Sequence, residues 1–430
     1  MQHSFEGLDR PGGIDRVGLL KPLRSRDFRL LWAGMSISLV GDGILLVAIA
    51  WTAYSLWNTP AALSVVGIAM TVPTIAWLLF GGAISDRRDR RKILLASDLG
   101  RGLVIGLLAA LTLAHALTFA LLVVLVAFYA TGTAFFTPAF ESIVPAIVAP
   151  GDLAQANALD QFVRPLAFRL AGPALGGVLV GSLGAGSAFA LDAASFAASA
   201  AAVLAMSPSA SPVAATGSTA AAVADGLRFV RRHVWLWGTL VSAAIAYLAF
   251  LGPTEALLPF MVKNVLHGSA TDLGIVFAAG GVGAVGAAAL MGQRGHPRRD
   301  MTLIYVCWTT ATVVVVGYGL ARTVPQLMVA CLLFNALEAA GTIMWATLKQ
   351  RQIPTHLLGR VSSLDWLISI SLLPLSFAVT GPVADAIGVR ATLVGAGAIG
   401  AVATASALLL PGMRAVEGTV APGAAAAASG

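Results

Sequence analysis

The sequence predicts an all-α integral membrane protein with twelve transmembrane helices in two six-helix halves. Of its 430 residues, 58% are hydrophobic and only 11% are charged, and the mean hydropathy is +0.85. Soluble proteins usually carry about 25% charged residues, so this composition excludes that class. The apolar residues also fall in runs of about 20, the length that crosses a hydrocarbon core of roughly 30 Å. The predicted spans are residues 28–55, 63–84, 93–114, 117–136, 157–182, 185–206, 236–259, 271–291, 300–321, 325–348, 361–384 and 391–410.

The distribution of basic residues predicts the topology. Lys and Arg collect on the cytoplasmic side of membrane helices. With these spans, 21 of the 27 Lys and Arg lie on the side of the N-terminus, three on the other side and three within spans. We therefore expect a multi-pass protein of the cytoplasmic membrane with both termini in the cytoplasm. The net charge of +7 follows from this topology, and we expect no nucleic-acid partner.

The chain divides at its centre. Residues 207–219, SPSASPVAATGST, read as a flexible linker, and ADGLRFVRRH (224–233) reads as a basic amphipathic piece on the membrane surface. The predicted units are a cytoplasmic tail (1–27), an N-terminal half (28–206), a cytoplasmic linker (207–235), a C-terminal half (236–410) and a low-complexity, disordered tail (411–430).

An internal repeat supports two equivalent halves. PLAFRLAGP (165–173) and PLSFAVTGP (374–382) match at five of nine positions, at an offset of 209. Arg90 and Arg299, in the loops after spans two and eight, are also 209 apart. Two parallel halves with a site between them is a known plan for transporters.

The loop GAISDRRDRRK (82–92) resembles the signature loop of the major facilitator superfamily. The residues on that pattern are Gly82, Asp86, Arg87, Arg90 and Arg91. Asp89 stands where the family has its second glycine. A carboxylate at a helix end can pair with bases and face the positive N-terminus of a neighbouring helix. The resemblance therefore predicts a conformational latch between the halves; the alternative is a solvated, positive-inside loop.

Span five carries GPALGG (172–177), which partly resembles a pattern of the family's antiporters. Phe168 replaces the first glycine of that pattern. Gly172, Pro173, Gly176 and Gly177 are candidates for gating, and close helix packing is the alternative role.

Two longer segments are similar to the branch that contains macrolide-efflux proteins and siderophore exporters. They are FFTPAFESIVPAIVAPGDLAQANAL (135–159) and QIPTHLLGRVSSL (352–364), which includes the gating candidates Gly359 and Arg360. The resemblance covers most of residues 20–410. It implies the major facilitator fold, alternating access, and export of hydrophobic or amphipathic small molecules, such as drugs, by proton antiport. No cofactor besides the proton gradient is implied. An uptake carrier, a lipid flippase and a siderophore exporter remain alternatives.

Ionisable groups within spans are costly and are therefore functional candidates. Asp42 lies in span one, Glu255 in span seven and Glu338 in span ten. In the family's fold, spans one, four, seven and ten line the central cavity, so we expect all three acids to face the substrate path. Asp42 and Glu338 are the preferred proton carriers, and a structural ion pair is the alternative for each.

Three arginines also lie within spans. Arg169 breaks the repeat, since Ala378 is its counterpart, and we expect it to meet a carboxylate or an anionic ligand. Arg164 shares a helical stripe with Asn157 and Gln161, and we expect this stripe to form an inner gate or a wall of the cavity. Asp98 and Arg101, three residues apart, are predicted to pair with each other or with the loop at Asp86.

Enzymatic activity is not expected. The sequence contains no HExxH, GxSxG or Walker motif, and its six histidines are scattered along the chain. Cys307 and Cys331 lie within spans, so packing is their expected role, with no metal site and no disulfide. The expected partners are a small hydrophobic or amphipathic substrate, protons and the lipid bilayer, and the chain is expected to be monomeric.

Overall fold

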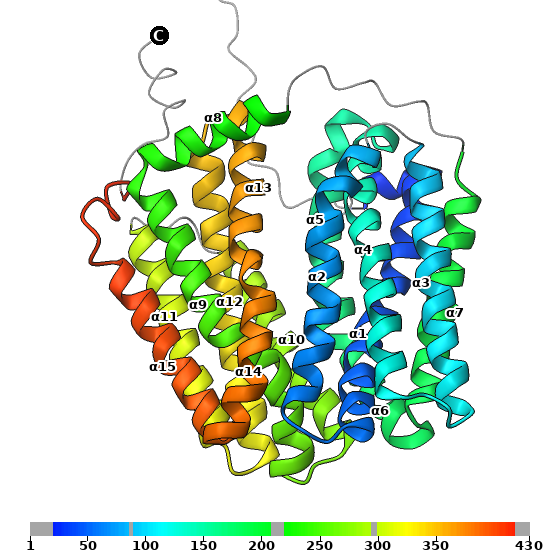
Figure 1. Cartoon of the computed structure of the whole chain (residues 1–430). Helices are drawn as coiled ribbons and strands as arrows, with labels where there is room; N and C mark the ends of the chain where they lie inside the picture. The colour runs from blue at the N-terminus through cyan, green and yellow to red at the C-terminus, as the bar shows by residue number, and fades with distance from the viewer. Residues whose placement is uncertain (1–19, 86–88, 208–218, 294–298, 418–430) are drawn as a thin grey trace, which may run out of the picture.

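A computed structural model describes residues 20–85, 89–207, 219–293 and 299–417. In these ranges the chain folds into helices joined by short turns, with no β-strand (Figure 1). Helices satisfy every backbone hydrogen bond within one segment, which a lipid environment requires. Side-chain caps fix where several of them begin. The hydroxyl of Ser25 accepts the N–H of Phe28 at the start of α1, and that of Thr118 accepts the N–H of Leu121 at the start of α4.

Each half contains six spans. The N-terminal half comprises η1 (Lys21–Arg24), α1 (Arg26–Leu56), α2 (Ala61–Ser85), α3 (Arg90–Leu113), α4 (Phe119–Ile147), η2 (Pro150–Asp152), α5 (Leu153–Arg164), η3 (Pro165–Ala171), α6 (Gly172–Leu183) and α7 (Ala185–Leu204). The helix α8 (Thr219–Arg232) precedes the C-terminal half. That half comprises α9 (Val234–Phe260), η4 (Met261–Val265), α10 (Ala270–Gln293), α11 (Asp300–Leu320), α12 (Val324–Gln352), α13 (Thr355–Ser371), α14 (Leu373–Ile387) and α15 (Val389–Ala407).

The predicted architecture is confirmed. Among the described residues, eleven segments are long and apolar enough to cross a membrane. The twelfth span is α2, whose apolar stretch Ala61–Trp77 continues as helix to Ser85. The basic amphipathic segment of the linker forms α8, which packs on α9 and α13.

The described part of the predicted C-terminal tail packs on the C-terminal half. Met413 and Val416 are buried, and a carboxylate oxygen of Glu417 accepts the N–H of Thr302 at 2.6 Å. These side chains cover the start of α11, and a disordered tail stays a prediction. The remainder of the tail, from residue 418, lies outside the described residues.

Spans five and eleven are interrupted at corresponding places. In span five, the π-helical η3 begins at Pro165 and separates α5 from α6. In span eleven, α13 ends before Leu372 and α14 begins with Leu373 and Pro374. Proline removes a backbone donor and crowds the preceding turn, which explains why both helices break there. Pro165 and Pro374 are the first residues of the two copies of the internal repeat. The two halves therefore share not only the repeated sequence but also a break in the helix at the same place.

Among the described residues, the main contacts between the two halves lie at one end of the bundle. We call the end that carries Lys21, α8 and Glu417 the terminal end, and the opposite end the far end. Towards the far end, α6 and η3 pack on α10, and α14 packs on α2. Among the described residues, α5 and α13 pack closely only on elements of their own half. The ribbons of the halves accordingly converge at the far end and diverge at the terminal end, which is uppermost in Figure 1.

Candidate functional site

A cavity of about 420 Å³ lies between the halves; we call it the central cavity. The N-terminal half contributes residues of α1, α2, α4 and η3, and the C-terminal half residues of α9, α10, α13 and α14. Its walls are mainly apolar, with Phe168, Phe277 and Phe377 from three different elements. Among the described residues that line it, two carry carboxyl groups, Asp42 and Glu255. The cavity therefore combines a hydrophobic surface with two sites for charge or protons.

Asp42 and Glu255 have different surroundings. Asp42 Oδ1 accepts the hydroxyl of Tyr129 at 2.5 Å, so α4 fixes the orientation of this carboxyl. Glu255 is exposed to the cavity, and no hydrogen bond or ion pair to another described residue is recorded for it. Asp42 is thus a positioned carboxyl group, whereas Glu255 is available to a ligand.

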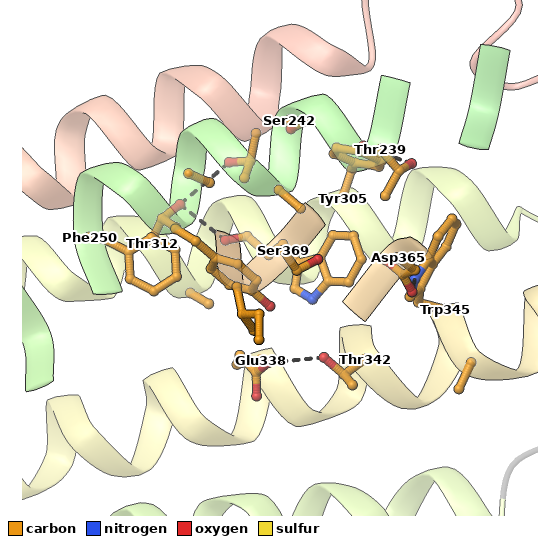
Figure 2. A pocket seen from close by; sticks show the side chains of 18 of the residues that line it. Thr239, Ser242, Phe250, Tyr305, Thr312, Glu338, Thr342, Trp345, Asp365 and Ser369 are labelled. Carbon is orange, nitrogen blue, oxygen red and sulfur yellow. Dashed lines mark hydrogen bonds between the residues drawn. The ribbon is translucent and has the colours of Figure 1, made fainter. Parts of the chain in front are cut away.

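Glu338 lies in a second cavity, inside the C-terminal half. This C-terminal cavity has a volume of about 310 Å³ and is lined by α9, α11, α12, α13 and α15 (Figure 2). Glu338 Oε1 accepts the hydroxyl of Thr342 at 3.0 Å. Asp365, on the opposite wall, accepts both the ammonium group of Lys349 and the indole N–H of Trp345. Asp365 is therefore neutralised by its own partner, while Glu338 has no basic partner recorded among the described residues.

The two cavities are neighbours. Trp366 and Ile370, both on α13, line the central cavity on one side and the C-terminal cavity on the other. Asp42 and Glu255 thus line the central cavity, whereas Glu338 lines the C-terminal cavity. A shared substrate path for the three acids stays a prediction.

The arginines of span five have partners that sequence reasoning did not predict. Arg169, in η3, donates from Nη1 to Oδ1 of Asn335 on α12 at 3.0 Å, a bond between the halves. No carboxylate forms an ion pair with it among the described residues, so a contact of Arg169 with an anionic ligand stays a prediction. Arg164 pairs with Asp160 one turn earlier, with 2.8 Å between Nε and Oδ2.

The predicted pair of Asp98 and Arg101 is present and buried. Arg101 Nη2 donates to Asp98 Oδ1 at 2.5 Å, and the two side chains are 0% and 3% exposed. The guanidinium lies between the rings of Phe136 and Phe196, at 4.3 and 4.5 Å from their centroids. The second oxygen of Asp98 accepts the hydroxyl of Ser199 at 2.7 Å. The pair thus ties α3 to α7 within the N-terminal half.

Each glycine of GPALGG has its own neighbour. Gly172 packs on Gly43 and Gly176 on Ile44, both on α1 of the same half. Gly177 instead packs on Gly274 of α10, in the other half. Pro173 also reaches α10, because its carbonyl lies against Gly274. The motif therefore serves internal packing on one side and the contact between the halves on the other.

The described part of the signature loop binds its own half. Arg90 donates to the carbonyl of Ser142, and Arg91 to those of Val203 and Leu204 at the end of α7. Asp89 caps α3 by accepting the N–H of Arg91 at 3.0 Å, which accounts for an aspartate at the family's glycine position. Gly82 lies near the end of α2, and Asp86 and Arg87 lie outside the described residues. The latch role of this loop stays a prediction.

Gly359 and Arg360 lie in the first turns of α13. The backbone of Gly226 on α8 packs against the side chain of Arg360, so the linker helix contacts the terminal end of span eleven. Their gating role likewise stays a prediction.

Sequence reasoning missed three polar residues of the site. They are Tyr129, Asp192 and Asn335. Asp192 lies within the predicted span 185–206, so the rule that marked the other intramembrane acids would have marked it too. Tyr129 and Asn335 carry no charge, and only the fold shows that they bind Asp42 and Arg169.

Most of the chain matches one protein family. A family model described as transmembrane secretion effector covers residues 17–423. The chain belongs to this family, a branch of the major facilitator superfamily. Among characterised members of similar sequence, the multidrug efflux pump Tap of Mycolicibacterium fortuitum is 28% identical, over 84% of this chain and 90% of its own. The macrolide efflux protein A of Streptococcus pyogenes is 24% identical, over 84% and 90%. The enterobactin exporter EntS of Citrobacter koseri is 29% identical, over 83% and 84%.

Solved structures show the same fold. A bacterial homologue of the lysosomal transporter Spinster, in an inward-facing and unoccupied conformation, has a TM-score of 0.67 and 14% identity, over 92% of this chain and 98% of that one. The nucleoside transporter NupG has a TM-score of 0.66 and 11% identity, over 89% and 98%. The chain therefore has the predicted fold.

Proposed function

We propose that the protein exports hydrophobic or amphipathic small molecules across the cytoplasmic membrane by proton antiport. The observation that carries this proposal is the central cavity, where apolar walls from both halves enclose Asp42 and Glu255. The relatives that pump drugs, macrolides or a siderophore support a transport role over catalysis.

The assigned sidedness is consistent with export. Basic residues are concentrated at the terminal end, which we assign to the cytoplasm. Because the main contacts between the halves, among the described residues, lie towards the far end, we infer that the cavity is accessible from the cytoplasm. This is the state in which an exporter collects its substrate. Opening of the far end must break contacts between the halves, among them the bond from the Tyr54 hydroxyl to the carbonyl of Ala256 and the bond from the Lys263 ammonium to the Ser55 hydroxyl.

The two acids of the central cavity have separate roles in this mechanism. Glu255, exposed and without a recorded partner, faces the substrate. Asp42, fixed by Tyr129, carries the proton. A proton on Asp42 removes a charge from the cavity, and its release restores that charge, so the two protonation states favour different arrangements of the halves.

We expect Asp42→Asn to abolish proton coupling while passive substrate movement continues. The measurement is proton flux in everted vesicles with a fluorescent pH dye, on addition of macrolides, siderophores or lipophilic dyes. Substrate should trigger alkalinisation of the lumen with the wild type, and the signal should fall at least about tenfold with Asp42→Asn. Asp152→Asn is the control, since Asp152 pairs with Lys21 outside the cavity, at 2.7 Å.

Glu338→Gln tests the other preferred proton carrier in the same assay. Because Glu338 lines the C-terminal cavity and not the central one, we expect this variant to keep proton coupling. Two outcomes contradict the assignment of Asp42 as the proton carrier. In the first, Asp42→Asn and the control Asp152→Asn lose the proton signal equally. In the second, only Glu338→Gln loses it. Substrate movement by wild-type protein without any proton signal contradicts antiport.

A further inference from the structure

Asp192, on α7, is a buried acid that the mechanism above does not use. Its side chain is 0% exposed and lines neither cavity. Oδ1 accepts the hydroxyl of Ser195 at 3.2 Å, while Oδ2 has no hydrogen-bond partner among the described residues. A buried carboxylate with an unsatisfied oxygen is costly, and a bound proton removes both the charge and the unsatisfied oxygen.

Asp192 is directed at the segment of α1 that carries Asp42. Gly41, the residue before Asp42, packs so closely on α7 that a Cβ there would overlap the Asp192 carboxyl and the Ser195 side chain. Tyr129, which donates to Asp42, also lies within electrostatic reach of Asp192. The two carboxyl groups therefore approach each other from neighbouring helices, with only one of them in contact with the central cavity.

The charges around Asp192 leave it without a basic partner. Of the elements packed on α7, α1 contributes Asp42, α3 contributes Asp98 and Arg101, and α6 contributes no titratable side chain. Tyr129 approaches from α4. The guanidinium of Arg101 is hydrogen-bonded to Asp98, so three carboxyl groups share one cation that is already paired. This cluster can take up and release a proton with no further charged partner.

A metal ion is not the expected occupant of this cluster. Within the described ranges of the chain, no group of three or more His, Cys, Asp or Glu side chains has an arrangement that could hold a metal ion. The proton is the ligand that a single unsatisfied carboxylate oxygen can bind alone.

We propose that Asp192 stores the transported proton outside the substrate cavity and exchanges it with Asp42. In this step the O–H bond of the Asp42 carboxylic acid breaks and an O–H bond forms at Asp192 Oδ2, with no change in the total charge. Asp42 is then ionised and still accepts the Tyr129 hydroxyl, while the proton is screened from the substrate. This inference rests on the proton antiport proposed above.

The test uses Asp192→Asn in the full-length chain. Asparagine has the shape of a protonated aspartate and no exchangeable acid proton, so the packing against Gly41 is retained. In proteoliposomes with radiolabelled erythromycin, we expect exchange to stay within about twofold of the wild type and accumulation driven by a proton gradient to be lost. Asp160→Asn, in the partly exposed pair with Arg164, is the control and should keep both activities.

A second measurement does not depend on transport. Infrared difference spectra of the purified protein between high and low pH should show the carbonyl stretch of a buried protonated carboxyl group. We expect this band in the wild type and in Asp160→Asn, and a reduced band in Asp192→Asn.

The outcomes separate the two proposals. An unchanged band in Asp192→Asn, or proton-driven accumulation by that variant at the wild-type level, overturns the role of Asp192. Loss of exchange together with accumulation in a variant that elutes and melts like the wild type also overturns it, because the residue would then serve the conformational change. A third outcome concerns the wild type, which could show the infrared band of the protonated carboxyl group but neither exchange nor accumulate erythromycin or any other compound of the vesicle panel. That result overturns the proposed function and leaves the protonation of Asp192 standing.

Discussion

Gly177→Ala is expected to shift the protein away from the state that is open at the terminal end. A Cβ on Gly177 would lie 2.8 Å from Gly274 Cα and 3.0 Å from the carbonyl oxygen of Ala270, and both are backbone atoms of α10. Overpacking of this kind costs about 1–3 kcal/mol. This contact joins the halves at the far end, so the free-energy cost falls on the arrangement that is closed there and open at the terminal end. The population of that arrangement should drop roughly 5- to 150-fold relative to the arrangement that is open at the far end.

The measurement is the distance between spin labels at Phe162 on α5 and Gly359 on α13, in a background without the native cysteines. We expect the distance in Gly177→Ala to shorten as the terminal end closes, and transport to fall about tenfold or more. Gly176→Ala is the matched control. Its Cβ would lie 2.9 Å from Ile44 Cα, a contact equally tight but within one half. If both variants change the distance alike, or neither does, the GPALGG segment serves packing alone.

Asp98→Ala is expected to destabilise the fold by about 3–5 kcal/mol. The substitution leaves the guanidinium of Arg101, which is 3% exposed, between two phenylalanine rings without its counter-charge. Replacing both residues with apolar side chains, as in Asp98→Leu with Arg101→Met, should restore most of the loss, since no uncompensated charge remains. Thermal unfolding in detergent measures both effects.

Asp160→Ala is the control for this prediction. It also breaks an ion pair of one helix, but the Arg164 and Asp160 side chains are 40% and 20% exposed. Such a pair contributes about 0–1 kcal/mol, so unfolding should shift little. If Asp98→Ala and Asp160→Ala lower the unfolding temperature equally, burial does not determine how much the Asp98–Arg101 pair contributes to stability.

The fold was predictable because its determinants are local or periodic. Hydropathy locates the spans, and the repeat at an offset of 209 indicates the two halves. The interruptions of spans five and eleven were not predicted, although Pro165 and Pro374 mark both places, because proline inside a membrane helix is often tolerated. Whether the helix continues through it depends on neighbours that the sequence does not show.

The site was predictable only where its contacts are short-range. The Asp98–Arg101 pair follows from a spacing of three residues on one helix. Asn335 binds Arg169 from 166 residues away, so their bond depends on how the halves dock. Glu338 was expected in the central cavity from the family's fold, but it lines the neighbouring C-terminal cavity, and no local pattern distinguishes the two cavities.

The interrupted spans have a mechanical consequence. Their far-end segments, α6 and α14, contact the opposite half, whereas among the described residues α5 and α13 pack closely only on their own half. Bending at Pro165 and Pro374 would therefore swing α5 and α13. With 12 and 17 residues, these helices are roughly 18 and 26 Å long at 1.5 Å per residue. The same 10° swing would move their tips by roughly 3 and 4.5 Å. An opening of this kind would widen unevenly, with the larger displacement on the side of α13, the helix that carries Trp366.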